Sequence, residues 1–311
     1  MRIVTLTLNP CIDESTRVER VEPDTKLRCD PPRREPGGGG LNVARAIARL
    51  GGEAEAWYVA GGPTGDILET ILEADGVRYR RVHVEGWTRQ NLMVTDRSTG
   101  KQYRFIQPGP ELADDEWRGV LDDFAGLDPP PEYLVASGSL PPGAPEDFYA
   151  RLGRVLPPET RYVLDTSGEA LHQAVAEGAD AGLFLLKPNV LELSRIVDRD
   201  LQDDPEAQEG AARELIEHEC CRAVVISKGG QGALLVTAGE ARSFRAPRVE
   251  VDSKVGAGDS MVAGMVVALA RGDDLEEAVR FGVAAGAAAV TTPGSELCPR
   301  EVTERLLPEV S

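Results

Sequence analysis

The sequence predicts an α/β fold with a mostly parallel central sheet and a small β-sheet lid. Three observations support it: short apolar strands that end in small or polar residues, helical patterns between them, and two stretches that keep neither pattern. Strands that alternate with helices favour right-handed βαβ units, which build parallel sheets. Ligands of such sheets bind at the carboxyl ends of the strands.

The first half of the chain alternates strand and helix patterns twice. IVTLTL at 3–8 has the β-branched content of a buried strand. The helical period of LNVARAIARL at 41–50 stops at a glycine pair, which is typical of a helix end. AEAWYVA at 54–60 and TGDILETILEADGV at 64–77 then repeat the order of strand and helix.

The second half continues the alternation. Four short apolar runs predict further strands: YLVAS at 133–137, YVLD at 162–165, GLFLL at 182–186 and AVVIS at 223–227. The run MVAGMVVALA at 261–270 predicts a buried helix near the end of the chain.

Two stretches, about 14–35 and 87–108, lack the helical period. The second contains a turn signal at Ser98 to Gly100 between two strand-like arms. We expect these stretches to form the lid, and the whole of 1–311 to be one domain.

The composition excludes several classes of function. A net charge of -18 and a pI near 4.7 argue against a nucleic-acid partner or an anionic membrane surface, because the long-range field repels both. Five cysteines without metal-ligand spacing indicate reduced thiols. The chain carries no apolar leader and no apolar run long enough to span a bilayer. We therefore expect a soluble, cytoplasmic protein.

SKVGAGDS at 253–260 places Asp259 at the start of the late apolar helix, behind Gly256, Ala257 and Gly258. One interpretation is an ordinary N-cap, in which the carboxylate accepts from the first helical amides. The other is that these amides bind an anion while Asp259 accepts a proton.

Four other features also carry two interpretations. GGGG at 37–40 fits either a flexible linker or an anion-accepting helix start, with Asn42 nearby, and Asp13 fits either a turn or a sugar-hydroxyl acceptor. KPNVLE at 187–192 is either a simple helix start or an amide and an acid that orient hydrated Mg²⁺. SKGGQGA at 227–233 fits a nucleotide phosphate or a tight turn.

The order of the motifs discriminates between these interpretations. GGGG with a following Asn, TRQN, SGSLPPG, KPNxxE, SxGxxGA and GAGDS follow one another across almost the whole chain. In this the sequence resembles the ribokinase-like (PfkB) family of carbohydrate kinases, which have a three-layer α/β fold. LTLNPCID, KLRC, SGEAL and FGVAAGAAA resemble the 6-phosphofructokinase branch. The 1-phosphofructokinases and tagatose-6-phosphate kinases typically carry Lys at the position of Gly39.

The resemblance implies an ATP-dependent 6-phosphofructokinase that phosphorylates the 1-hydroxyl of fructose 6-phosphate in glycolysis. Asp259 would be the catalytic base, and the amides of Gly256, Ala257 and Gly258 the anion hole. We also expect the dipole of the helix N-terminus to keep Asp259 ionised. Fructose 1-phosphate and tagatose 6-phosphate stay open as alternative substrates.

The resemblance also implies the ligand contacts. Cations of the lid would hold the substrate phosphate. The sugar phosphate would be bound by Asp13, Lys26, Arg28, Gly38, Gly39, Asn42, Arg89 and Ser139, with Arg104 as an addition of ours. ATP would be bound by Lys187, Asn189, Ser227, Gly229 and Gly232, and Glu192 would act through the waters of Mg²⁺. For any single arginine the alternative is a solvated surface side chain.

Many members of the family hold a monovalent cation. The equivalent positions for K⁺ are Ser253, Val255, Ala289, Thr292, Gly294 and Glu296, where Thr292 and Glu296 depart from the Asn and Arg expected in the 6-phosphofructokinase branch. The family's lid often forms a dimer interface, so we expect a homodimer.

Two other classes of function fit the sequence less well. A nicotinamide oxidoreductase would share the alternation of strands and helices, but the first βα turn lacks GxGxxG. A non-catalytic sugar-binding module would not need both Asp259 and a glycine anion hole.

Overall fold

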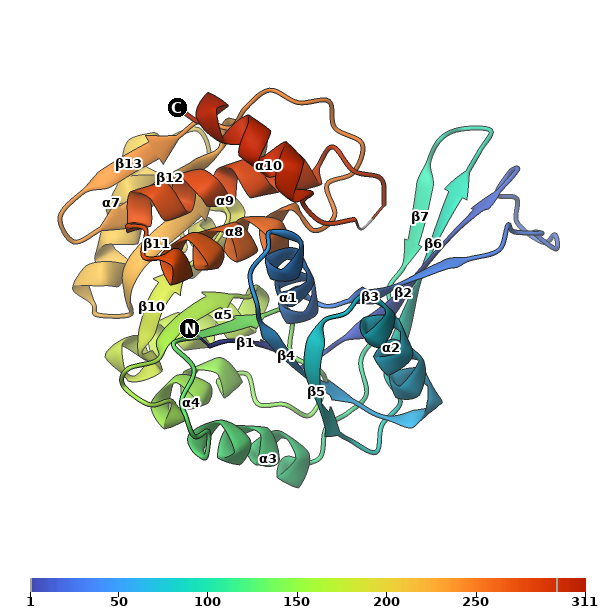
Figure 1. The fold of residues 1–311 in the computed structure, drawn as a ribbon, viewed down its shortest axis with the longest axis horizontal. Helices are drawn as coiled ribbons and strands as arrows, with labels where there is room; N and C mark the ends of the chain where they lie inside the picture. Colours follow the sequence, from blue (N-terminus) through green and yellow to red (C-terminus); the bar gives the residue numbers. More distant parts are fainter. Residues whose placement is uncertain (1, 295) are drawn as a thin grey trace.

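The central sheet of the protein has nine strands. The computed structural model describes residues 2–294 and 296–311, and Figure 1 shows their arrangement. From one edge to the other the strands are β13 (Ala241–Phe244), β12 (Ala233–Thr237), β11 (Cys221–Ser227), β10 (Leu183–Leu186), β9 (Arg161–Asp165), β8 (Tyr133–Ser137), β1 (Ile3–Thr7), β4 (Glu55–Ala60) and β5 (Arg78–His83).

The sheet confirms the prediction of a mostly parallel arrangement. All neighbours from β11 to β5 pair in parallel, whereas β12 and β13 add an antiparallel edge. The strands expected at 3–8, 54–60, 133–137, 162–165, 182–186 and 223–227 all form. The strands β5, β12 and β13 were not predicted. β5 (RYRRVH) and β13 (ARSF) are rich in polar residues, and β12 (ALLVT) directly follows the glycine motif at 227–233.

Helices cover both faces of this sheet. One face packs against α1 (Gly39–Arg49), α2 (Gly62–Ala74), α8 (Ala257–Arg271), α9 (Leu275–Ala289) and α10 (Arg300–Leu306). The other face packs against α3 (Asp114–Ala125), α4 (Phe148–Val155), α5 (Gly168–Ala176), α6 (Val190–Ile196) and α7 (Pro205–Glu217). Short 3-10 turns lie at Gly178–Ala181, Gly229–Gln231 and Leu307–Glu309.

Strand β4 shows how one sequence serves both layers of helices. Successive side chains of a strand point to opposite faces of the sheet. Accordingly Ala56 and Tyr58 belong to the hydrophobic cluster under α1 and α8, while Trp57 belongs to the cluster under α3 and α4. The ring of Trp57 lies 4.8 Å from that of Phe124 on α3. The result is the expected three-layer fold.

A four-stranded sheet projects from one side of this body (Figure 1). Its order is β3 (Arg33–Gly37), β2 (Cys11–Val18), β6 (Arg89–Asp96) and β7 (Gln102–Phe105). The central pair β2 and β6 is parallel, and the outer pairs are antiparallel. We call these four strands, with the segment 19–32, the lid. Strand β2 begins at Cys11, three residues before the stretch expected from the sequence, because Cys11 and Ile12 already pair with β3 and β6.

Helices α8 and α9 pack through glycines. A Cβ on Gly264 would lie 2.9 Å from both the Cβ of Ala285 and the Cα of Gly282. A Cβ on Gly282 would lie 2.6 Å from the Cγ of Met265. The missing side chains let the two helices approach closely, and this contact fixes the position of α8, whose first turn carries Asp259.

Two general expectations concern the chain as a whole. In the described residues, no helix combines the length and apolar content needed to cross a bilayer. All five cysteines are free thiols; four are buried and Cys29 is exposed.

Replacing Gly264 by Ala should destabilise the protein by about 1–3 kcal/mol, because the added methyl group overpacks the contact between α8 and α9. The matched control is Gly210→Ala on α7, where an added Cβ meets nothing within 4 Å. That control should stabilise the protein by about 0.5–1 kcal/mol through helix propensity. Urea unfolding measures both variants, and equal effects of the two would contradict this account.

Candidate active site

Asp259 lies in the first turn of α8, whose N-cap is Gly256. Gly256 has a φ of 76°, in the left-handed region that favours glycine, and it offers no side chain to the first helical amides. The Oδ2 of Asp259 accepts a hydrogen bond from the Nδ2 of Asn42 at 2.9 Å. The interpretation of Asp259 as an N-cap is therefore wrong: its carboxylate points across to α1.

The carboxyl ends of β9 and β10 bring two more charges to this helix start. The ammonium of Lys187, whose side chain is 6% exposed, lies 3.0 Å from the Oδ1 of Asp165. A Cβ on Gly258 would lie 3.7 Å from the same ammonium nitrogen. Asp165, Lys187 and Asp259 thus form one cluster, which we call the charged cluster.

The pKa of Asp259 is raised to about 6, first by burial and then by the charge of Asp165. The hydrogen bond from Asn42 and the charge of Lys187 act in the opposite direction. Burial and the charge of Asp165 therefore oppose the ionisation that we expected the helix start to favour. The carboxylate still titrates below neutral pH.

Lys187 keeps its positive charge although it is buried. Burial by itself lowers the pKa of a lysine, but Asp165, Glu192 and Asp259 together raise the pKa of Lys187 above its ordinary value. The ammonium of Lys187 therefore interacts favourably with all three carboxylates.

Sequence reasoning missed Asp165. The signal was present, since YVLD ends a predicted parallel strand in a carboxylate, and such strand ends line ligand sites. What could not be read from the sequence is that Lys187, at the end of the neighbouring strand, pairs with it.

Asn189 and Glu192 make a reciprocal capping box at the start of α6. The Oδ1 of Asn189 accepts from the backbone N–H of Glu192 at 2.9 Å, and the Oε2 of Glu192 accepts from that of Asn189 at 2.8 Å. The segment thus starts a helix, as both interpretations of it require. Burial raises the pKa of Glu192, and both Lys187 and Asp165 influence it, so this carboxyl borders the charged cluster.

Ser227, Gly229 and Gly232 lie together beyond the end of β11. The backbone N–H of Ser227 donates to the carbonyl of Pro188 at 2.9 Å, which joins this segment to the start of α6. Gly229 and Gly232 have positive φ angles of 56° and 102°. A Cβ on Gly232 would lie 1.8 Å from the carbonyl oxygen of Phe244, so only glycine fits there.

These glycines border a pocket of about 640 Å³ that reaches the start of α8. Its volume is within the usual range for small-molecule sites. The lining is apolar on one side and glycine-rich on the other: Ser227, Gly229, Gly230, Gly232, Pro247, Val249, Val251, Lys254, Ala257, Gly258, Met261, Val283, Ala287 and Val290 are among its residues.

Asp13 lies on β2 where the lid joins the body. Its Oδ1 accepts from the Nδ2 of Asn91 at 2.9 Å and from the thiol of Cys11 at 3.2 Å. A Cβ on Gly37 would lie 2.3 Å from the Oδ2 of Asp13, so the glycine run passes directly beside the carboxylate. Asn91, the last residue of TRQN, is a second residue that the sequence did not single out.

Gly38 and Gly39 begin α1 opposite the end of β8. Gly38, with a φ of 118°, is the N-cap of the helix. A Cβ on Gly39 would lie 2.2 Å from the Oγ of Ser137 and 2.9 Å from the backbone nitrogen of Gly138. The run is therefore a tightly packed helix start, and the interpretation as a flexible linker is wrong.

Arg89 and Ser139 are joined through Asn9. The guanidinium of Arg89 donates to the carbonyl oxygens of Asn9 at 2.9 Å and Gln107 at 3.1 Å. The Nδ2 of Asn9 donates to the Oγ of Ser139 at 3.3 Å. Within the described part of the chain no carboxylate pairs with Arg89, and its buried Nε has no hydrogen-bond acceptor. Its positive charge is therefore not neutralised.

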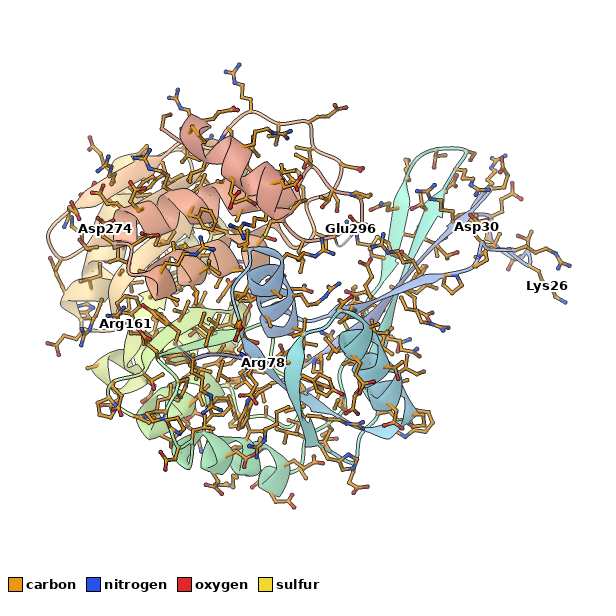
Figure 2. All side chains as sticks on the ribbon, viewed as in Figure 1. Lys26, Asp30, Arg78, Arg161, Asp274 and Glu296 are labelled. Carbon is orange, nitrogen blue, oxygen red and sulfur yellow. The ribbon has the colours of Figure 1, made fainter. Side chains whose placement is uncertain are left out.

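Lys26 and Arg28 do not join these residues. Both are exposed in the segment 19–32, and Figure 2 shows Lys26 at the outer end of the lid, away from the body. Arg104 on β7 is exposed as well and contacts Gln102. Within a single chain these cations lie outside the site.

The segments expected to hold K⁺ meet beside the start of α8. The hydroxyl of Ser253 donates to the carbonyl of Gly294 at 2.6 Å and accepts from the N–H of Val255 at 3.2 Å. The hydroxyl of Thr292 contacts the carbonyl oxygens of Ala289 and Glu296, both at 2.7 Å. Such an oxygen-rich set of donors suits a hard cation.

The departure at Glu296 has a structural counterpart. Its Oε1 lies 2.9 Å from a guanidinium nitrogen of Arg33 on β3, so an ion pair links this loop to the lid. Figure 2 shows Glu296 on the side of the body that faces the lid. No group of three His, Cys, Asp or Glu side chains in residues 2–294 and 296–311 is arranged to hold a metal ion.

Residues 6–301 match the family described as pfkB family carbohydrate kinase. The chain belongs to this family. It is 44% identical over 305 residues to the ATP-dependent 6-phosphofructokinase isozyme 2 of Mycobacterium tuberculosis, covering 98% of this chain and 88% of the relative. The enzyme of the same name from Escherichia coli K12 is 44% identical over 307 residues, with 98% of each chain covered. The 1-phosphofructokinase of Bacillus subtilis is 33% identical over 309 residues, with 99% and 98% covered.

Solved structures agree with the fold. Phosphofructokinase-2 from Escherichia coli in complex with potassium has a TM-score of 0.92 and 42% identity, covering 99% of this chain and 98% of that chain. The tetrameric inhibited form of that enzyme gives 0.91 and 43%, with the same coverage. Ribokinase from Thermotoga maritima, at 24% identity, gives 0.74 over 98% of this chain and 99% of that chain. The expected ribokinase-like fold is confirmed.

Replacing Asp165 by Asn should lower the pKa of Asp259 below its present value of about 6. The change removes a negative charge that opposes ionisation and leaves Lys187 free to favour it. NMR titration of the Asp259 carboxyl carbon measures the shift. Asp147→Asn, which removes the carboxylate of a surface ion pair with Arg151, is the matched control and should leave this pKa unchanged. A pKa in the Asp165 variant equal to or above that of the wild type would contradict the prediction.

Proposed function

We propose that this protein is an ATP-dependent 6-phosphofructokinase, which transfers the γ-phosphoryl group of ATP to the 1-hydroxyl of fructose 6-phosphate and forms fructose 1,6-bisphosphate and ADP in glycolysis. The observation that carries the proposal is the position of Asp259. Its carboxylate lies in the first turn of α8, behind a glycine N-cap and beside the pocket that Ala257 and Gly258 line.

The transfer step follows from this geometry. Asp259 accepts the proton of the sugar 1-hydroxyl while the hydroxyl oxygen bonds to the γ-phosphorus and the bond to ADP breaks. The backbone amides of Gly256, Ala257 and Gly258 form the anion hole, and the helix dipole adds to their positive field. With a pKa of about 6, Asp259 is ionised at neutral pH and is a competent base.

The nucleotide occupies the pocket of about 640 Å³. Its phosphates lie toward Lys187 and Asn189, and Ser227, Gly229 and Gly232 line the phosphates and ribose. Mg²⁺, when bound with ATP, neutralises phosphate charge, and Glu192 orients its waters. The residues present fit Mg²⁺, because the carboxyl of Glu192 borders the charged cluster, which includes the carboxylate of Asp165.

The sugar phosphate lies between the lid and α1. Asp13, Gly38, Gly39, Asn42 and Ser139 contact its hydroxyls. Arg89 binds the 6-phosphate. Its positive charge, which pairs with no described carboxylate, favours this contact.

Lys26 and Arg28 take part only if the lid of a second copy covers the site. We infer a homodimer on this ground. The edge strand β7 is uncovered and carries exposed Tyr103 and Phe105. Sedimentation at assay concentration tests the assembly: a purely monomeric active enzyme contradicts it, and a tetramer, the state of the inhibited Escherichia coli relative, extends it.

K⁺ is proposed as an activator, held by Ser253, Val255, Ala289, Thr292 and Gly294. The oxygen donors of these segments support it. Activity that is identical in K⁺ and in tetramethylammonium salts contradicts it. We also place the protein in the cytoplasm, a reducing compartment that suits five free cysteines.

A related kinase activity, on fructose 1-phosphate or tagatose 6-phosphate, is the alternative. Gly39 favours our proposal, because the kinases of both alternative substrates typically carry Lys at this position. A coupled assay with the three sugar phosphates decides between them. A much higher kcat/KM for either alternative substrate would replace fructose 6-phosphate.

Replacing Asp259 by Asn should lower kcat by at least about a hundredfold, the scale expected for loss of a positioned base, with little change in ATP affinity. Steady-state kinetics and nucleotide titration measure the two quantities. The control Asp273→Asn makes the same substitution beyond the other end of α8, where the side chain is exposed, and should be neutral. Equal turnover by the Asp259 variant would favour a sugar-binding module.

Replacing Arg89 by Ala should chiefly raise KM for fructose 6-phosphate, by about tenfold or more, because a charge-assisted contact to the 6-phosphate is lost. The comparison variant is Arg78→Ala on the edge strand β5, which removes an exposed ion pair between Arg78 and Glu53. An unchanged KM in the Arg89 variant would remove this residue from the phosphate site.

A further inference from the structure

Arg45 is a buried cation one turn along α1 from Asn42. Its side chain is 5% exposed, and three acceptors surround its guanidinium. The Nε donates to the Oδ2 of Asp75 at 2.6 Å, and one terminal nitrogen donates to the carbonyl of Pro36 at 3.3 Å. The same nitrogen donates to the Oδ1 of Asn42 at 3.4 Å.

The contact with Asn42 gives the amide a direction. A side-chain amide has an acceptor oxygen on one side and a donor NH₂ on the other. In Asn42 the oxygen faces Arg45 and the NH₂ faces Asp259, at 2.9 Å from its Oδ2. A flipped amide would place NH₂ against the guanidinium and oxygen against the carboxylate, so both contacts would become repulsive.

We propose that Arg45 is a positioning residue, which holds the amide of Asn42 in the orientation that donates a hydrogen bond to Asp259. The inference rests on the proposed function, in which Asp259 is the base. Of the three groups that its guanidinium contacts, Asn42 is the one hydrogen-bonded to Asp259 in the described residues.

The consequence is chemical as well as structural. An amide fixed as donor stabilises the ionised carboxylate and cannot accept a hydrogen bond from the protonated one. The charged groups that face Asp259 from the neighbouring strands are Asp165 on β9 and Lys187 beyond β10. Asp165 opposes ionisation and Lys187 favours it, so the donor on α1 adds to the effect of Lys187. Without Arg45 the amide flips when Asp259 is protonated, and protonation becomes easier.

The experiment measures the pH profile of kcat/KM for fructose 6-phosphate in the wild type and in two variants. Arg45→Met removes the guanidinium and keeps an unbranched side chain. Arg45→Lys keeps a positive charge near Asp75 but loses the planar guanidinium, which contacts Asn42 in addition to Asp75. In both variants the apparent pKa of the acidic limb should rise by about 1, the scale of one charge-assisted hydrogen bond, and activity should recover toward the wild-type value above pH 8.

Two controls separate positioning from folding. Asp75→Asn removes the charge of the ion pair but keeps an acceptor for Arg45, so the limb should stay in place. In an Asn42→Ala background, Arg45→Met should add no further shift, because its effect passes through the amide. If Arg45→Met does not fold, Arg45→Lys in the same two comparisons decides.

Each outcome has one meaning. A limb that stays in place in either Arg45 variant, an equal shift in Asp75→Asn, or an additive shift with Asn42→Ala overturns the role of Arg45. A wild type without sugar-kinase activity, or with an acidic limb that Asp259→Asn leaves intact at full turnover, overturns the proposed function instead.

Discussion

The site depends on one buried ammonium. Lys187 is almost fully enclosed, and a charge in such a position is stable only when it is paired. Asp165 supplies the direct partner at 3.0 Å, and the carboxyls of Glu192 and Asp259 add to its field. Two neighbouring strand ends and the starts of two helices must therefore meet at one point. This requirement places the catalytic candidate, the capping box of α6 and the glycine start of α8 together.

The glycines in the contact between α8 and α9 also determine where the first turn of α8 lies. Because Gly264 and Gly282 have no side chains, the two helices lie closer than larger residues would permit. The position of α8 along the sheet sets where its first turn meets Lys187. A packing contact in the hydrophobic core thus determines the geometry of a polar site between one and two helical turns away.

The distribution of charge explains how an acidic protein binds two anions. A net charge of -18 repels phosphates at long range, but salt screens that field over about 8 Å. Arg89 and Lys187, the cations that we propose to contact these anions, are both held by the fold in fixed directions. Lys26 and Arg28, by contrast, are carried on a lid that extends away from the body (Figure 1), so their contribution depends on assembly.

The sequence by itself determined the alternation of strands and helices, the two lid stretches, the family and most of the residues that we propose for the site, because these are encoded in local period and in short motifs. Tertiary structure alone decided that Asp259 points to Asn42 and not to its own helix amides, that Asp165 pairs with Lys187, and that Arg45 contacts the side-chain amide of Asn42. Those facts join residues that lie far apart in the sequence or depend on a side-chain direction. Neither distance nor direction leaves a periodic signal along the chain.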